Sequence, residues 1–98
     1  MKRIEQQIED EFVEKSRTYG VRAIKFIDPS NTGAPDRLIF CPNGRTLLIE
    51  FKKPGGKVAE KQIEYHRWLD SLGFQVEIHD SVDEAIQSLE RFLDGDSN

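Results

Sequence analysis

The feature that most constrains the fold of this chain is a β-hairpin signal near its middle. The turn sequence Pro-Asn-Gly at 42–44 separates an apolar run at 36–41 from another at 45–53, and Asn-Gly between two such runs strongly favours a hairpin. Residues two apart in a strand point to the same face. One face of the second strand is therefore entirely apolar and must be buried, and it consists of Leu47, Ile49 and Phe51. The opposite face combines an acid and a base with a leucine, and it consists of Leu48, Glu50 and Lys52.

The length of the turn decides which side chains of the two strands face each other. A three-residue turn at 42–44 pairs Cys41 with Arg45. Counting outward from that pair places Asp36 directly opposite Glu50, with their Cβ atoms about 5 Å apart on one face. A strict two-residue turn would instead place Asp36 and Glu50 on opposite faces. We expect the odd-length turn, or a bulge.

Two carboxylates placed side by side repel each other, and a bound cation would remove this repulsion. Asp36 and Glu50 offer hard oxygen ligands, which suit Mg²⁺ or Mn²⁺. Lys52 stands beside them and could stabilise negative charge on a phosphate or orient a water molecule. The spacing thus predicts a metal site for phosphodiester chemistry. The alternative is structural, because acids and lysines are common at strand ends and Asp36 could simply mark a turn.

The segments on either side of the hairpin predict helices and strands that would cover it. Apolar residues recur at helical spacing in two segments, and an S-x-x-E capping box opens a third. The predicted order is αβββαβα, an α/β fold with a mixed central sheet flanked by helices. The predicted segments are a helix over 3–19 that ends at Gly20, strands at 21–27 and 74–78, a helix over 58–72, and a last helix opened by Ser81 and Glu84.

Composition limits the size of the core and the kinds of partner. At 98 residues the chain is near the lower limit for a domain that folds alone, which favours a partner subunit. We expect residues 1–94 to form a single domain and residues 95–98 a disordered tail. The net charge of −4 argues against nucleic-acid binding. However, the segment 50–67 carries a local group of cations, namely Lys52, Lys53, Lys57, Lys61 and Arg67.

The sequence also bears on location and redox chemistry. No apolar run approaches the roughly 20 residues of a membrane span, and charged residues follow Met1 where a signal peptide would be apolar. These patterns predict a cytoplasmic protein that is not bound to membranes. A single cysteine cannot form an intrachain disulfide, and Cys41 lies in an apolar stretch. We therefore expect Cys41 to be a buried structural thiol.

Four residues outside the hairpin allow more than one interpretation. Glu9 borders the apolar stripe of the first helix, and it is either a further site acid or a solvated helix residue. Gln62 is the polar member of the 58–72 stripe, so its amide needs a hydrogen-bond partner at the site or in the backbone. Lys25 lies on the apolar side of its strand and needs an anionic partner unless it reaches solvent. Trp68 is expected in the core or at an interface rather than as a base-stacking platform.

The motifs together resemble a known nuclease family. Gly33-Ala34-Pro35-Asp36-Arg37, followed by Ile49-Glu50-Phe51-Lys52, resembles the PD-(D/E)XK nuclease signature. Over nearly its whole length the chain most resembles the stand-alone VRR-NUC domains of phages and bacteria. These combine a helix glutamate, a glycine, a strand lysine, G-x-P-D-R, E-x-K, a Pro-Gly-Gly turn and a helix glutamine. The corresponding residues in this chain are Glu9, Gly20, Lys25, 33–37, 50–52, 54–56 and Gln62.

The resemblance implies a fold, a reaction and a site. The fold would be a restriction-endonuclease-like αβββαβ core, with an extra C-terminal helix in this chain. Mg²⁺ or Mn²⁺ would be bound by Asp36, Glu50 and the backbone carbonyl of Phe51. Lys52 would be the catalytic lysine, and the supporting catalytic roles would fall to Glu9 and Gln62. The cations expected to contact DNA are Lys25, Arg37, Lys53, Lys57 and Lys61.

The resemblance to Holliday-junction resolvases implies a homodimer that cuts branched DNA, such as four-way junctions, in a bacterial or phage-infected cell. One departure concerns the second helix, because many relatives start it with Leu-Ser where this chain has Lys57-Val58-Ala59. Two other functions fit the same residues. A catalytically silent module would bind branched DNA equally well in EDTA. An assembly protein, with Asp36 and Lys52 as a plain salt bridge, would gain no stability from Mn²⁺.

Overall fold

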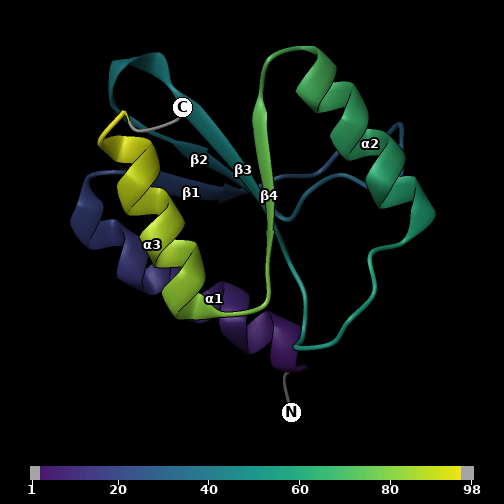
Figure 1. The fold of residues 1–98 in the computed structure, drawn as a ribbon, viewed down its shortest axis with the longest axis horizontal. Helices are drawn as coiled ribbons and strands as arrows, with labels where there is room; N and C mark the ends of the chain where they lie inside the picture. Colours follow the sequence, from purple (N-terminus) through teal and green to yellow (C-terminus); the bar gives the residue numbers. More distant parts are fainter. Residues whose placement is uncertain (1–2, 96–98) are drawn as a thin grey trace.

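A computed structural model describes residues 3–95, and its element order confirms the predicted αβββαβα arrangement (Figure 1). The predicted tail at 95–98 lies outside the described residues apart from Gly95. The elements are α1 (Ile4–Ser16), the 3₁₀ turn η1 (Arg17–Tyr19), β1 (Arg22–Lys25), β2 (Arg37–Phe40), the 3₁₀ turn η2 (Pro42–Gly44), β3 (Thr46–Phe51), α2 (Glu60–Ser71), β4 (Gln75–His79) and α3 (Val82–Leu93).

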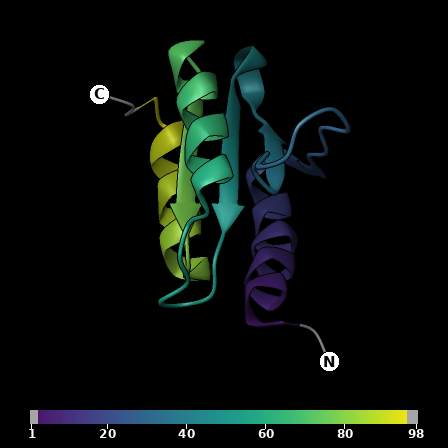
Figure 2. The same cartoon turned by 90° about the vertical axis from the view of Figure 1, so that its right-hand side faces the viewer.

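The four strands form one mixed sheet in the order β1-β2-β3-β4. Strands β1, β2 and β3 are antiparallel neighbours, whereas β4 runs parallel to β3. A parallel pair needs a crossover connection, and α2 provides it. Helices α1 and α3 pack on one face of the sheet and α2 packs on the other, so the molecule has three layers (Figure 2).

Strand β3 lies between β2 and β4 and is buried on both faces. Leu47, Ile49 and Phe51 join the larger core cluster with residues of α1 and α3, as predicted. On the other face, Leu48 packs against Tyr65 of α2. Glu50 on that face is only 3% exposed although it carries a carboxylate. A carboxylate buried at the centre of a sheet is costly unless it is paired or binds a cation, so this residue requires an explanation.

The register of the hairpin is the one predicted for a three-residue turn. Arg37 pairs with Ile49, and the N–H of Cys41 donates to the carbonyl of Arg45 at 2.9 Å. Asn43 within the turn has a φ of 66°, a left-handed conformation that asparagine tolerates better than most residues. Extending this register by one position places Asp36 opposite Glu50.

Two predictions about α2 are wrong in detail. The helix begins at Glu60 and not at residue 58, because the side-chain oxygen of Gln62 accepts a 2.9 Å hydrogen bond from the N–H of Ala59 and closes the first turn there. Leu72 was expected in the buried stripe but is 56% exposed, because it follows the end of the helix. Trp68 is not a core residue either, since 55% of it is exposed.

The other helix signals are confirmed. The first helix ends in the η1 turn, and Gly20 follows with a φ of 74°. The hydroxyl of Ser81 accepts from the N–H of Glu84 and caps α3, as the capping box predicts. Cys41 is buried and free. No helix within residues 3–95 is long and apolar enough to span a bilayer.

Candidate active site

A polar cavity of about 390 Å³ opens beside the end of β3, between α1 and the start of α2. It brings together side chains from both helices, from β1 and from the hairpin. The residues that line it are Arg3, Glu5, Gln6, Glu9, Lys25, Asp36, Glu50, Phe51, Lys52, Lys53, Gly56, Lys57 and Gln62. All of the predicted catalytic residues and metal ligands are therefore in one cavity, although they are spread over most of the sequence.

Asp36 is anchored directly before β2, the first strand of the hairpin. Its Oδ2 accepts a 2.7 Å hydrogen bond from the backbone N–H of Phe51. The N–H and C=O of one strand residue point to the same side, so the carbonyl of Phe51 is also directed towards the edge that Asp36 occupies. Burial raises the pKa of the Asp36 carboxyl, and the hydrogen bond from Phe51 opposes this rise.

Glu50 is the most perturbed acid of the site. Burial and then the neighbouring charge of Asp36 raise its pKa to about 7, against the lowering effect of Lys52. Its Oε2 accepts from the side chain of Gln62 at 2.9 Å, and Lys52 Nζ lies 3.7 Å from the same oxygen. Its Oε1 is buried without a hydrogen-bond partner. Two close carboxyls, one with an unsatisfied oxygen, fit a site that a cation completes.

Gln62 joins the candidate catalytic groups to each other. Its Oε1 accepts a 2.8 Å hydrogen bond from Lys52 Nζ, and its Nε2 donates to Glu50. The amide that was out of place in an apolar helix stripe thus has its partners at the site. A side chain on α2 fixes the positions of an acid and a base on and beside β3.

Glu9 is buried and paired, and it is not a solvated helix acid. It is 3% exposed, and its Oε2 accepts from Lys25 Nζ at 2.9 Å and from Arg37 Nε at 2.6 Å. The predicted anionic partner of Lys25 is therefore Glu9. Glu5 also lines the cavity, but it pairs with exposed Arg3 at 3.3 Å. Of the two glutamates of α1 that line the cavity, Glu9 is the buried one.

His66 is a site neighbour that was not among the predicted site residues, because a lone histidine on a helix is more often structural or exposed than catalytic. Its Nε2 lies 4.0 Å from Glu50 Oε1, and both atoms are buried without a hydrogen-bond partner. Burial lowers the pKa of His66, and Lys52 lowers it further. The available signal was its position one helical turn after Gln62, which places it on the same side of α2.

Comparison with known proteins identifies the family. The family model described as the VRR-NUC domain matches residues 2–83. The chain belongs to the VRR-NUC domain family. A relative named "Putative nuclease p44", from Acyrthosiphon pisum secondary endosymbiont phage 1, is 42% identical over 79 residues, which cover 81% of this chain and 85% of that protein. A solved structure described as a VRR_NUC domain superposes with a TM-score of 0.84 at 22% identity, covering 93% of this chain and 99% of its own.

These findings confirm the expected family and fold. The structure of this VRR-NUC domain also shows which of the cations expected to contact DNA are exposed and which are paired within the protein. Lys53 and Lys57 line the cavity and are exposed, whereas Lys61 is exposed but lies outside it. Lys25 lines the cavity while it pairs with Glu9, and Arg37 is largely buried against the same carboxylate. Arg37 is therefore placed to support Glu9 more than to meet a phosphate.

The donor set of this VRR-NUC domain suits a hard divalent cation. Within residues 3–95 no three His, Cys, Asp or Glu side chains are arranged to hold a metal ion by themselves. Mg²⁺ is commonly bound by one or two carboxylates, with water and substrate phosphates completing its shell. Asp36, Glu50 and the carbonyl of Phe51 offer this kind of incomplete, oxygen-only site.

Proposed function

We propose that this VRR-NUC domain is a Mg²⁺- or Mn²⁺-dependent endodeoxyribonuclease that hydrolyses phosphodiester bonds in branched DNA, such as four-way junctions. The observation that carries the proposal is the pair Asp36 and Glu50. They lie opposite each other across the hairpin and share one cavity with Lys52, and burial raises the pKa of both carboxyls, so a bound cation would favour their ionised forms. The phage relative bears a nuclease name, which supports the same reaction class.

The residues have separable roles in this reaction. Asp36, Glu50 and the Phe51 carbonyl would hold the divalent ion, which when bound supplies a more acidic water molecule and charge stabilisation at the phosphate. Lys52 donates to a phosphate oxygen as negative charge develops there. Gln62 keeps Lys52 and Glu50 in place through its two hydrogen bonds.

DNA binding would rest on a local group of cations, because the chain as a whole has a net charge of −4. Lys53 and Lys57 at the cavity and Lys61 beside it are exposed and can neutralise phosphates. A homodimer would double this surface and place two sites on two strands of a junction. Because these contacts are ionic, binding should weaken as salt rises, and more steeply the more phosphates the lysines neutralise.

The test is a cleavage panel of four-way junction, flap, single-stranded and duplex DNA with Mg²⁺ or Mn²⁺. Wild-type protein should cut branched DNA, and Asp36→Ala should not. The matched control is Asp70→Ala, an exposed acid on α2 outside the cavity, which should cut like wild type. Absence of metal-dependent cleavage of any of these DNAs would overturn the enzyme proposal.

Two side measurements identify the alternative functions. Equal affinity for junctions with and without EDTA, together with no cleavage, would indicate a silent DNA-binding module. In thermal unfolding experiments, Mn²⁺ should raise the Tm of the wild type, because a ligand that binds only the folded state stabilises it. The Tm of Asp36→Asn should not change with Mn²⁺. No shift in the wild type would favour an assembly protein.

A further inference from the structure

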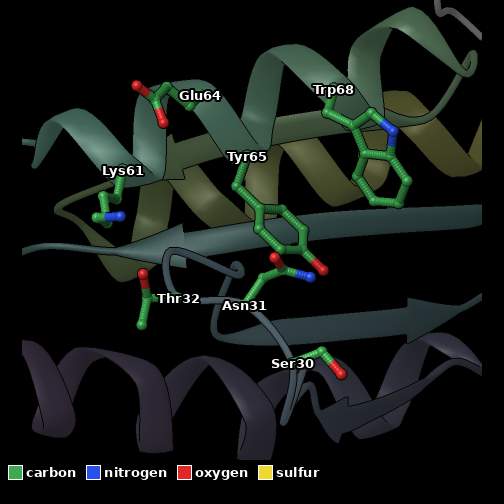
Figure 3. Close-up of a pocket in the computed structure, with 7 residues that line it drawn as sticks. All are labelled: Ser30, Asn31, Thr32, Lys61, Glu64, Tyr65 and Trp68. Carbon is green, nitrogen blue, oxygen red and sulfur yellow. The ribbon is translucent and has the colours of Figure 1, made fainter.

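A second and larger cavity, of about 590 Å³, lies between the 28–33 loop and α2. Figure 3 shows its lining: the loop residues 30–32 on one side, and the helix residues Lys61, Tyr65 and Trp68 on the other. The predicted catalytic residues are not among those that line it. This cavity is therefore distinct from the candidate active site.

The loop that forms this cavity is held firmly against α2 at both ends. At its start, Asp28 Oδ2 accepts a 2.8 Å hydrogen bond from the hydroxyl of Tyr65, and Asp28 Oδ1 accepts from the N–H of Ser30 at 2.8 Å. At its end, Gly33 has a φ of 96°, and a Cβ atom there would lie 2.4 Å from the carbonyl oxygen of Lys61. The space between these two attachments is thus a built feature of the fold.

The lining has the chemistry of a nucleobase site. Trp68 is 55% exposed, and it meets Tyr65 edge to face with ring centroids 5.6 Å apart, so its indole can accept a stacked ring. The amide of Asn31 and the hydroxyls of Ser30 and Thr32 offer hydrogen-bond donors and acceptors. Glu64 can accept from an exocyclic amino group and disfavours a phosphate inside the cavity.

Neighbouring residues of the chain line this cavity and the candidate active site. Lys61, whose ammonium can bind the adjoining phosphate, directly precedes Gln62, which is hydrogen-bonded to Glu50. The loop leads through Gly33 into Asp36. A strand with its scissile phosphate at Asp36 and Glu50 would have to pass Lys61 and Gln62, which line the two cavities, to place a base beside Trp68.

We propose that the cavity between the 28–33 loop and α2 binds an unpaired nucleobase of the DNA strand being cut, stacked on Trp68. The proposal rests on the proposed nuclease function. A base inside a duplex is already stacked and paired, so this site selects DNA with an unpaired nucleotide beside the scissile phosphate. It thereby narrows the substrate to flaps, single strands and junctions with an open base pair at the branch point.

Binding can be measured directly, because Trp68 is the only tryptophan of the chain. In EDTA, a single-stranded oligonucleotide should quench its fluorescence, and a blunt duplex of equal length should quench it less. By anisotropy of a labelled strand, Trp68→Ala should raise Kd about 5- to 100-fold, because base–aromatic stacking has that range of effect. Trp68→Phe should retain most of the affinity. The control Leu72→Ala, equally exposed just beyond the C-terminal end of α2 and not part of the cavity lining, should bind like wild type.

Cleavage assays separate this proposal from the nuclease function. With Mn²⁺, Trp68→Ala should raise KM for a flap substrate and leave kcat unchanged. Quenching by single strands without cleavage of any DNA would overturn the nuclease function and leave the nucleobase site standing. Cleavage without quenching, and with equal Kd for wild type and Trp68→Ala, would overturn the nucleobase site. A shift of sedimentation equilibrium towards monomer in Trp68→Ala would also overturn it, because a second copy of the chain would then occupy the cavity.

Discussion

Gln62 Nε2 donates a 2.9 Å hydrogen bond to Glu50 Oε2, which joins an amide on α2 to a carboxylate on β3. The other end of the same amide accepts from Lys52 and from the backbone N–H of Ala59. An amide can bridge an acid and a base at once, because one end only donates and the other only accepts. Gln62 therefore orients both groups and also fixes the start of its own helix.

Replacing Gln62 should impair catalysis more than folding. Gln62→Ala frees Lys52 and Glu50, and kcat should fall about 10- to 100-fold, as when other groups that orient metal ligands are removed. Steady-state cleavage of the best branched substrate measures this. Gln87→Ala on the exposed side of α3 is the control, and it should retain full activity. Equal kcat in both variants would contradict an orienting role for Gln62.

The metal-free protein should lose stability as pH rises towards neutrality. Glu50 has a pKa of about 7 in the folded state against an ordinary value of 4.5, so between these values the folded protein holds a proton that the unfolded chain releases. The contribution is complete below pH 4.5 and disappears as pH passes 7. Glu50→Gln should therefore show a weaker fall in the free energy of unfolding across this range, measured by urea unfolding in EDTA.

Glu77 should make stability depend on pH in the opposite direction, which provides an internal check. Hydrogen bonds from His79, Ser88 and Gln75 outweigh the effect of burial and lower its pKa to about 2, so its contribution is present above pH 4.5 and is lost as pH falls towards 2. Glu77→Gln should reduce the dependence of the free energy of unfolding on pH below pH 4.5 and leave the dependence above it unchanged. If the free energies of unfolding of wild type and Glu50→Gln changed with pH in parallel between pH 4.5 and 7, the raised pKa of Glu50 would be contradicted.

Glu9 should matter for stability because two cations depend on it. Glu9→Gln leaves Lys25 and the largely buried Arg37 without their anionic partner, and it should cost about 2 kcal/mol, reduced from the fully buried case because Lys25 is half exposed. The matched control is Glu11→Gln. Glu11 forms an exposed salt bridge with Lys15, and its loss should cost at most about 0.5 kcal/mol. Similar unfolding free energies for both variants would contradict the prediction.

Gly33 should be less replaceable than another glycine with a positive φ. Gly55→Ala pays only for the left-handed backbone, about 1 kcal/mol, because nothing lies within 4 Å of the added Cβ. Gly33→Ala also forces the loop away from the Lys61 carbonyl and should cost about 1–3 kcal/mol more. Thermal or urea unfolding compares the two. An equal cost would mean that the loop is not held against α2 as described.

Glu9 and Gln62 show which features of the candidate site can be predicted from the sequence. Gln62 lies within an apolar stripe, which predicts a hydrogen-bond partner, whereas the position of Glu9 at the edge of its stripe fitted both a site acid and a solvated residue. The partners themselves could not be derived, because Glu9 meets Lys25 and Arg37 only after α1 packs on the sheet. Gln62 likewise meets Lys52 only after the crossover has laid α2 on the opposite face.

Trp68 and Leu72 show where the pattern failed. Leu72 belonged to the predicted core stripe and Trp68 was expected in the core or at an interface, yet both are more than half exposed. Whether a large apolar side chain is buried depends on which other element covers it. The 28–33 loop stops short of covering Trp68 and leaves the second cavity there instead.

The hairpin and its two faces could be predicted from local rules, because side chains alternate with a period of two. The opposition of Asp36 and Glu50 followed from the expected three-residue turn, which sets the register. The burial of Glu50, the hydrogen bonds of Gln62, the ion pairs of Glu9 and the cavity beside Trp68 could not be predicted in this way. Each of these depends on contacts between residues far apart in the chain, which form only when the two helix layers pack on the sheet.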